Sequence, residues 1–447
     1  MKKLVLALFI SLPLHAKTTA GCSPEFDSLI KKYNLDPDKA EIAQFEKDGK
    51  ILLDELFQER MKWHKQLPLL PNDCKVKLKQ VFLKMRERED YIGAHFYKAP
   101  QISANAIDYK KIPLPIYSPE SYAPYHLADS QKKFAFQSGD ILITKGVSFT
   151  SSTISEVVAQ RALFSHMVFI HVDEKTNVVS TMESYIGYGV KIFSIEEALR
   201  NENARILVLR SKDTALAKQA ADYMFERIEK KESAGERIPY DYVLNFNDNS
   251  KLSCEEIAYD AFKTVTSGKM IIPENLSQVD LKDQEFLEQI GIKAGPLMMP
   301  IDLEIDSRFE IVLDWTDYRV IRDSIRKDAV MGEVFHWMND HQYKLHSSMR
   351  SIAARMIWST RYIPGLWNLL ASVSGIPADF QKDVPGVAIS TLEKIKGTAG
   401  PILTFITTAD EEFHRENNRW MTPVELRKNI DSYLQKNPKD VINHFYK

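Results

Sequence analysis

Short strand-like runs in the middle of the chain constrain its fold more than any other feature. Runs of aliphatic and β-branched residues stand at positions 140–144, 167–172, 178–182 and 205–209. Between the first two runs, the capping-box spacing of Thr153 and Glu156 predicts the start of a helix. Strands mixed with helices over residues 136–325 predict an α+β or α/β core.

Helical patterns flank this core on both sides. Residues 17–92 carry apolar side chains at helical spacing, which predicts two helices, 42–61 and 76–91. Pro68 and Pro71 separate these helices. Residues 93–135 are rich in proline and tyrosine and show little periodicity, which is typical of an ordered connecting segment.

Residues 326–447 return to helix and form a predicted C-terminal helical domain. Within them, Thr422-Pro423-Val424-Glu425 has the pattern of a capping box with proline at the first helical position. The apolar stretch 363–376 is interrupted by proline and glycine, and its length suits a buried or interfacial segment rather than a membrane span. Trp358 and Trp367, in and beside this stretch, are predicted to be core residues.

The N-terminus has the pattern of a secretory signal peptide. Lys2 and Lys3 precede the apolar run 4–14, and Ala16 offers a small residue for cleavage. Residues 1–16 are therefore predicted to be removed, and no later apolar run is long enough for a transmembrane helix. We expect an exported protein, periplasmic or secreted.

Lipid attachment at Cys22 is an alternative to simple export. Thr19-Ala20-Gly21 supplies small residues before this cysteine. However, Thr19 stands where a large aliphatic residue is usual, and Lys17 interrupts the apolar run. The sequence favours export without the lipid anchor and leaves both open.

The chain has three cysteines, Cys22, Cys74 and Cys254. In an oxidising compartment two of them are expected to pair. Cys22 and Cys74 flank the N-terminal helical segment, so a Cys22–Cys74 disulfide is predicted and Cys254 is the leftover thiol. Free cysteine is often only a small buried hydrophobic residue, and that interpretation of Cys254 stays open here.

The residues around Cys254 suggest a reactive position. Ser253 and Glu256 have capping-box spacing, which places Cys254 at the first position of a helix. Free amide groups and the helix dipole at such a position stabilise a thiolate and can bind an oxyanion. The negative charges of Glu255 and Glu256 oppose the effect on the thiolate.

A thiolate nucleophile needs a base and a group that orients the base. His166 opens the apolar run 167–172, and Glu183 closes the run 178–182. Neighbouring antiparallel strands would bring Glu183 beside His166, where it can fix the imidazole tautomer. His171 lies at an odd offset from His166 and is predicted to point to the opposite face of the sheet.

Other classes of site have little support. The 59 basic and 61 acidic side chains give a formal net charge of -2, so no broad basic field indicates a nucleic-acid partner. His336, His341 and His346 are spaced by five residues and do not share one helical face, which argues against a metal site. No metal and no organic cofactor is expected.

Residues 136–262 resemble the permuted papain-like amidase family, also called the YiiX/YebB-like cysteine hydrolases, within the NlpC-type cell-wall peptidase superfamily. The resemblance is carried by Gly139-Asp140-Ile141-Leu142, by Ser165-His166 before an apolar strand, by Glu183 with Val190 after it, and by Tyr240-Asp241-Tyr242 followed by Leu252-Ser253-Cys254-Glu255-Glu256. Two positions depart from the pattern: Glu255 replaces a serine, and Val168 replaces a common glycine.

The resemblance implies a circularly permuted papain-like core with a small antiparallel sheet and packed helices. It also implies Cys254 as nucleophile, His166 as base and Glu183 as the orienting residue. The expected function is hydrolysis of an amide or peptide bond, with a peptidoglycan peptide as the favoured substrate. A lipid amide or ester hydrolase or acyltransferase, and a non-catalytic papain-like scaffold, remain as alternatives.

Overall fold

The computed structural model describes residues 22–96, 116–117, 134–200, 203–346, 349–363, 365–374, 376, 380–436 and 445–446. The predicted signal peptide and most of the connecting segment 93–135 lie outside this described part. Among the described residues, no helix is both long and apolar enough to cross a membrane.

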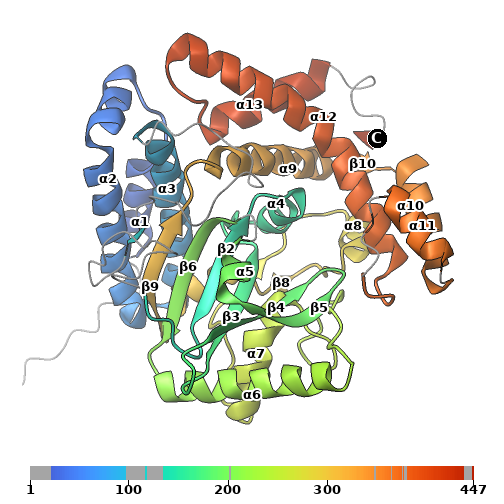
Figure 1. Ribbon diagram of the computed structural model, residues 1–447. Helices are drawn as coiled ribbons and strands as arrows, with labels where there is room; N and C mark the ends of the chain where they lie inside the picture. Colours follow the sequence, from blue (N-terminus) through green and yellow to red (C-terminus); the bar gives the residue numbers. More distant parts are fainter. Residues whose placement is uncertain are drawn as a thin grey trace, which may run out of the picture.

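A seven-stranded antiparallel sheet lies at the centre of the molecule, with strand order β1-β9-β6-β2-β3-β4-β5 (Figure 1). Its strands are β1 (Ile116–Tyr117), β2 (Ile141–Gly146), β3 (His166–Val172), β4 (Val179–Tyr185), β5 (Gly189–Ser194), β6 (Asn203–Ser211) and β9 (Phe309–Thr316). Two short strand pairs are separate from it: β7 (Ser277–Gln278) with β8 (Pro296–Leu297), and β10 (Lys344–Leu345) with β11 (Phe445–Tyr446). The sheet and its packed helices confirm the predicted mixed architecture.

Helices surround the sheet on several sides. Before β2 lie α1 (Cys22–Lys32), α2 (Lys39–Gln66), the short 3-10 helix η1 (Leu67–Leu69) and α3 (Asn72–Phe96). Within the core lie α4 (Phe149–Glu156), α5 (Ile195–Arg200), α6 (Thr214–Ser233), α7 (Cys254–Val265), α8 (Gln284–Gln289) and the 3-10 helix η4 (Pro300–Ile305). The C-terminal part holds α9 (Ile321–His341), α10 (Met349–Ser359), the 3-10 helix η5 (Thr360–Tyr362), α11 (Leu366–Ser374), α12 (Gly386–Asn417) and α13 (Pro423–Lys436).

The two faces of the central strands bury different partners. Met167 and Phe169 of β3 belong to the large core, in which Phe169 lies 6.0 Å from Phe262 of α7. Val168 and Ile170 alternate with them and belong to a second core on the opposite face. Because successive side chains of a strand point to opposite faces, α7 is tied to the Met167 side of β3.

Buried ion pairs join the N-terminal helices to the sheet. Arg60 of α2 and Arg86 of α3 both bind the carboxylate of Asp314 on β9, with 2.9 Å between Arg86 Nη1 and Asp314 Oδ2. Arg86 also binds Glu304 of η4, and Arg60 binds Glu89. These charges lie away from water, so each depends on its partners to offset the cost of burial. The predicted boundary between 92 and 93 falls inside α3, which runs on to Phe96.

The C-terminal helices continue directly from the core. α9 extends through the predicted boundary between 325 and 326, so that boundary does not coincide with the end of a structural element. The capping pattern predicted for α13 is confirmed: the Thr422 N–H donates to Glu425 Oε2 at 2.8 Å, and the Glu425 N–H donates to Thr422 Oγ1 at 3.3 Å. Trp358 and Trp367 are buried against each other with ring centroids 5.2 Å apart, which confirms that they are core residues.

The capping box predicted from Thr153 and Glu156 is wrong. α4 begins one turn earlier, with Ser148 as N-cap and its Oγ accepting from the Ser151 N–H at 3.1 Å. Thr153 lies inside the helix and donates to the Phe149 carbonyl, while Glu156 is the last helical residue. Hydroxyl residues recur between 148 and 153, so capping spacing alone did not identify the true helix start.

The structure describes the state of two of the three cysteines. Cys254 is a free, buried thiol, as the sequence predicted for the leftover cysteine. Cys74 is buried and disulfide-bonded. The Cys22 side chain lies outside the described residues, so the Cys22–Cys74 pairing and the alternative of lipid attachment both stay predictions.

Candidate active site

Cys254 occupies the first position of α7, as predicted. Ser253 is the N-cap in an extended conformation, and its N–H donates to Glu256 Oε2 at 2.8 Å. This bond forms the Glu256 side of the predicted capping box. The thiol therefore lies where a helix presents free N–H groups and a partial positive charge.

The environment of Cys254 favours the neutral thiol. Burial raises the pKa of Cys254 well above its ordinary value, and the negative charge of Glu255 raises it further. The backbone N–H of Met167 acts in the opposite direction and lowers this pKa. The net effect is a protonated thiol at neutral pH, so a nucleophilic Cys254 must lose its proton to a base as it reacts.

Glu256 does not carry a full negative charge beside the helix N-terminus at neutral pH. Burial raises the pKa of Glu256 to about 8, with a further contribution from the charge of Asp241. The carboxyl is therefore mostly protonated at pH 7, which removes one of the two charges that the sequence placed against a thiolate.

His166 and Glu183 meet as predicted. His166 Nε2 lies 3.0 Å from Glu183 Oε2, and the Glu183 side chain is buried. Two more donors hold the carboxylate: Thr181 Oγ1 donates to Oε1 at 2.8 Å, and the Tyr185 hydroxyl donates to Oε2. The Tyr185 ring also stacks on the imidazole with centroids 4.8 Å apart. Glu183 is thus fixed before it orients the histidine.

The strand register places Met167, the residue next to His166, on the face of β3 that packs against α7. Pairing between β3 and β4 extends from Val172–Val179 only to Phe169–Met182, so Met167 lies beyond the paired part of the two strands. Cys254 lies against the N–H of Met167, the residue that follows His166. Among the described residues no hydrogen bond joins Cys254 to His166, whose Nε2 contacts Glu183. Neither His166 nor Glu183 is among the residues that line the apolar pocket beside Cys254.

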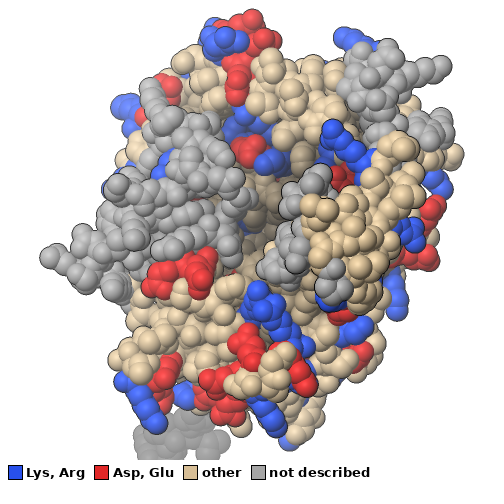
Figure 2. All heavy atoms as spheres, turned by 45° about the vertical axis from the view of Figure 1, so that its right-hand side comes forward, with Lys and Arg blue, Asp and Glu red and all other residues tan. Residues whose placement is uncertain are grey.

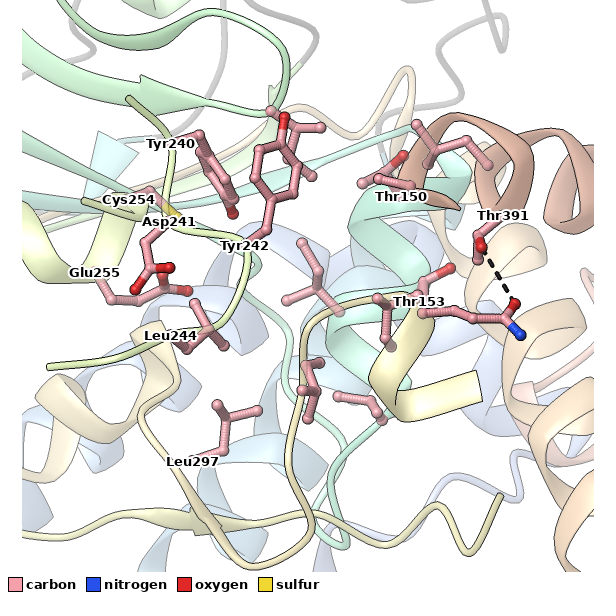
Figure 3. Close-up of a pocket in the computed structure, with 18 of the residues that line it drawn as sticks. Thr150, Thr153, Tyr240, Asp241, Tyr242, Leu244, Cys254, Glu255, Leu297 and Thr391 are labelled. Atoms are coloured by element: carbon pink, nitrogen blue, oxygen red, sulfur yellow. Dashed lines mark hydrogen bonds between the residues drawn. The ribbon is translucent and has the colours of Figure 1, made fainter. Parts of the chain in front are cut away.

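Cys254 forms part of the wall of an apolar pocket that is partly open to solvent (Figure 3). Cys254, Glu255 and Leu244 lie on one side of it, and Thr150, Thr153 and Thr391 on the other. Aliphatic residues from four separate segments make up much of its lining, among them Ile154, Val157, Ile290, Met299, Leu392 and Ile395.

Tyr240 is a site residue to which sequence reasoning gave no role. It lines the pocket, and burial raises the pKa of its hydroxyl well above the ordinary value, with a further contribution from the negative charge of Glu255. The phenol therefore stays protonated and can donate a hydrogen bond inside the pocket. The sequence signal was its place in the Tyr240-Asp241-Tyr242 motif before the cysteine helix.

The hydrogen-bond partners of Glu183 and the residues of the pocket walls were not predicted from the sequence either. Thr181 and Tyr185 alternate with Glu183 along β4, and this alternation could have identified them as neighbours on one face. The wall residues from α8 and α12 lie far along the chain from Cys254, and no local pattern links them to it.

His336 and His341 lie on α9 with ring centroids 5.7 Å apart. α9 ends at His341, so His346 lies beyond the helix, and His336 Nδ1 contacts Asp340 at 2.9 Å. Among the residues that the structure describes, no group of three or more His, Cys, Asp or Glu side chains is arranged to hold a metal ion.

Comparison with known proteins leaves the family of this chain open. No protein-family model matches the sequence. No curated protein matches it either. Among solved structures, the chain is similar to the metalloprotein yiiX from Escherichia coli O157:H7 (DUF1105), with 16% sequence identity over 40% of this chain and 97% of that one. The TM-score of this match is 0.31, which does not establish a shared fold.

Proposed function

We propose that this protein is a cysteine-dependent acyl-transfer enzyme whose acyl group is apolar. The observation that carries the proposal is the position of the free Cys254 thiol, at a helix N-terminus and on the wall of a pocket lined largely by aliphatic side chains. His166 is the base and Glu183 its orienting residue, because the two are held together by the hydrogen bond between them.

The proposed reaction proceeds through an acyl-enzyme. Cys254 Sγ attacks the carbonyl carbon while His166 Nδ1 takes the thiol proton, and a carbon–sulfur bond forms. Amide groups at the start of α7 stabilise the oxyanion of the tetrahedral intermediate. Cleavage of the carbon–oxygen or carbon–nitrogen bond releases the leaving group, which receives the proton from His166. Water, or another acceptor, then attacks the thioester and restores the thiol.

The apolar lining of the pocket supports one of the two substrate classes that the sequence left open. A cell-wall peptide is polar and charged, and burying its groups among Ile154, Ile290 and Leu392 would leave them without hydrogen-bond partners. An acyl chain loses no hydrogen bonds there and gains about 0.8 kcal/mol for each buried methylene. We therefore favour a lipid amide or ester over the peptidoglycan peptide, with hydrolysis or transfer as the outcome.

The fold of the proposed enzyme is a permuted papain-like core. The chain order His166, Glu183, Cys254 and the packing of the cysteine helix on the sheet support this interpretation. Export to the periplasm or the outside, where lipids and cell wall are both accessible, is part of the same proposal and rests on residues 1–16.

The acyl-chain dependence of turnover tests the function. For a series of p-nitrophenyl esters, kcat/KM should rise by about fourfold for each added methylene until the pocket is filled. Ala388→Trp, which places an indole in the pocket wall, should abolish the rise while acetate ester turnover persists. Ala215→Trp on the exposed surface of α6 is the matched control and should behave as wild type.

Two results would count against the proposal. Turnover that is independent of chain length in the wild type would remove the argument for an apolar acyl group. A protein that binds acyl chains but shows no turnover that depends on Cys254 would instead be a binding or scaffold protein, the non-catalytic alternative.

A further inference from the structure

The segment Met349–Ser374, here called the 349–374 hairpin, comprises α10, η5 and α11 and projects at one side of the molecule (Figure 1). Its inner side is firmly packed. Ala354, Trp358, Trp367 and Ala371 form a small buried core with Val384 and Ile389, and Trp358 Nε1 donates to the Val384 carbonyl at 2.8 Å. The hairpin is therefore an ordered part of the fold.

The outer side of the same hairpin is apolar and open to solvent. Seven of its large apolar side chains are between 40 and 82% exposed: Met349, Ile352, Met356, Tyr362, Ile363, Leu366 and Leu369. Ile352 and Met356 are four residues apart on α10, so they lie on one face of that helix. Clustered exposed apolar residues of this kind mark an interaction surface, whereas scattered single ones do not.

The charge of the surrounding sequence has one sign. Residues 341–378 contain no Asp or Glu, but they contain Lys344, Arg350, Arg355 and Arg361. Arg350 and Arg355 are exposed, and the Arg361 guanidinium lies 4.9 Å from the Trp358 ring centroid and 4.4 Å from that of Tyr362. Apolar, aromatic and basic residues on one short helical segment are the composition of an interfacial membrane anchor.

The hairpin is linked to the pocket through shared neighbours. Tyr242 lines the pocket and also packs against the Trp358 core of the hairpin. The ring centroid of Phe380 lies 6.3 Å from that of Trp358 and 5.0 Å from that of Tyr188. Tyr188 follows two residues after Ile186, which lines the pocket. Figure 2, which brings this side of the molecule forward, shows a hollowed face with extensive uncharged surface.

We propose that the 349–374 hairpin docks the protein on an anionic phospholipid surface, with its outer apolar side chains at the boundary between head groups and acyl chains. Charge complementarity identifies this occupant, because three arginines and no carboxylate in residues 349–374 match a negatively charged surface. The docking does not depend on catalysis, but its purpose, delivery of an acyl chain to the pocket beside Cys254, rests on the proposed function.

Vesicle co-sedimentation of the full chain tests the docking separately from the chemistry. The protein carries Cys254→Ala throughout, so binding is measured without turnover. Vesicles of phosphatidylcholine with phosphatidylglycerol are compared with vesicles of phosphatidylcholine alone. The test variant is Met356→Gln/Ile363→Gln/Leu366→Gln, and the matched control is Ile51→Gln/Leu69→Gln/Val424→Gln, which alters three apolar residues exposed elsewhere. Circular dichroism and thermal melting verify that both variants are folded.

The expected result is binding to the anionic vesicles, at least tenfold weaker in the hairpin variant and unchanged in the control. Arg350→Gln/Arg355→Gln should weaken binding by about fivefold for each arginine and only on anionic vesicles. Equal binding by the hairpin variant and the wild type would overturn the proposal. The proposal would also be overturned if the protein were a dimer that bound no vesicles and the hairpin variant were a monomer. The hairpin surface would then bind a second copy of the chain. If the protein binds vesicles but the form that retains Cys254 shows no esterase activity, the proposed function is refuted and the docking proposal still holds.

Discussion

His166 Nε2 and Glu183 Oε2 lie 3.0 Å apart on adjacent antiparallel strands, with the carboxylate held from two further sides by Thr181 and Tyr185. This arrangement leaves Nδ1 as the ring atom that can accept a proton. It also makes Glu183 the residue through which the orientation of His166 can be tested without altering the histidine itself.

Replacing Glu183 by glutamine should reduce kcat/KM for ester substrates by about 10²- to 10⁴-fold, the range that a positioned base contributes. Glutamine keeps the size of the side chain but removes the charge that stabilises the imidazolium. Tyr185→Phe keeps the stacked ring, removes one donor to Glu183, and should cost far less. Equal losses in the two variants would indicate that the cluster only supports the fold.

Glu255→Gln should lower the pKa of Cys254, because the charge of Glu255 raises that pKa in addition to the effect of burial. The rate of iodoacetamide alkylation at Cys254, followed against pH, reports the thiolate fraction. We expect its midpoint to move to lower pH in Glu255→Gln and to stay in place in Glu232→Gln, an exposed position on α6. An unchanged midpoint in Glu255→Gln would show that burial alone sets the pKa.

Glu256 should make the protein less stable as the pH rises. Its folded pKa of about 8 exceeds that of an exposed carboxyl, chiefly because of burial, so the folded state binds the proton more tightly. The stabilisation of the folded state by this tighter proton binding is fully present below about pH 4.5 and is lost as the pH rises to about 8. Glu256→Gln should therefore raise the free energy of unfolding above pH 8, by on the order of 3 kcal/mol. Urea unfolding at pH 4 and pH 9 measures this difference, and a gain of equal size at both pH values would contradict the assignment.

Asp314→Asn should loosen the attachment of α2 and α3 to the sheet. The change leaves the buried guanidinium groups of Arg60 and Arg86 without the charge that they share, which typically costs about 3–5 kcal/mol. Glu236→Gln breaks the exposed pair with Lys231 and should cost less than about 1 kcal/mol. Equilibrium unfolding compares the two, and a small effect of Asp314→Asn would mean that solvent reaches the cluster.

Three of the four strands that were predicted from the sequence share a simple pattern. β2, β3 and β6 are continuous apolar runs, because both faces of the sheet are covered there. β5 begins with glycine and contains Lys191, and β9 contains Asp314, whose carboxylate serves Arg60 and Arg86. Neither pattern suggests a strand until the residues that pack on it are known.

The residues of the candidate site also divide into those that the sequence predicted and those that it did not. Cys254, Ser253 and Glu256 are neighbours in sequence, so helix capping predicted their arrangement. His166 and Glu183 followed from the expectation that two adjacent runs pair. The pocket could not be predicted, because Ile290, Leu392 and Ile395 reach Cys254 only through packing of α8 and α12. The predicted segment boundaries at 92 and 325 fall inside α3 and α9, because amphipathic patterns do not show where a helix passes from one core to the next.

The most direct measurement is intact-protein mass spectrometry after brief reaction with p-nitrophenyl decanoate. The account predicts one added decanoyl group, mapped to Cys254 by peptide analysis, absent in Cys254→Ala and formed more slowly in His166→Ala. It also predicts faster formation than with the acetate ester. An adduct that persists in Cys254→Ala, or no adduct and no turnover in the wild type, would contradict the assignment of Cys254 as an acyl-accepting nucleophile.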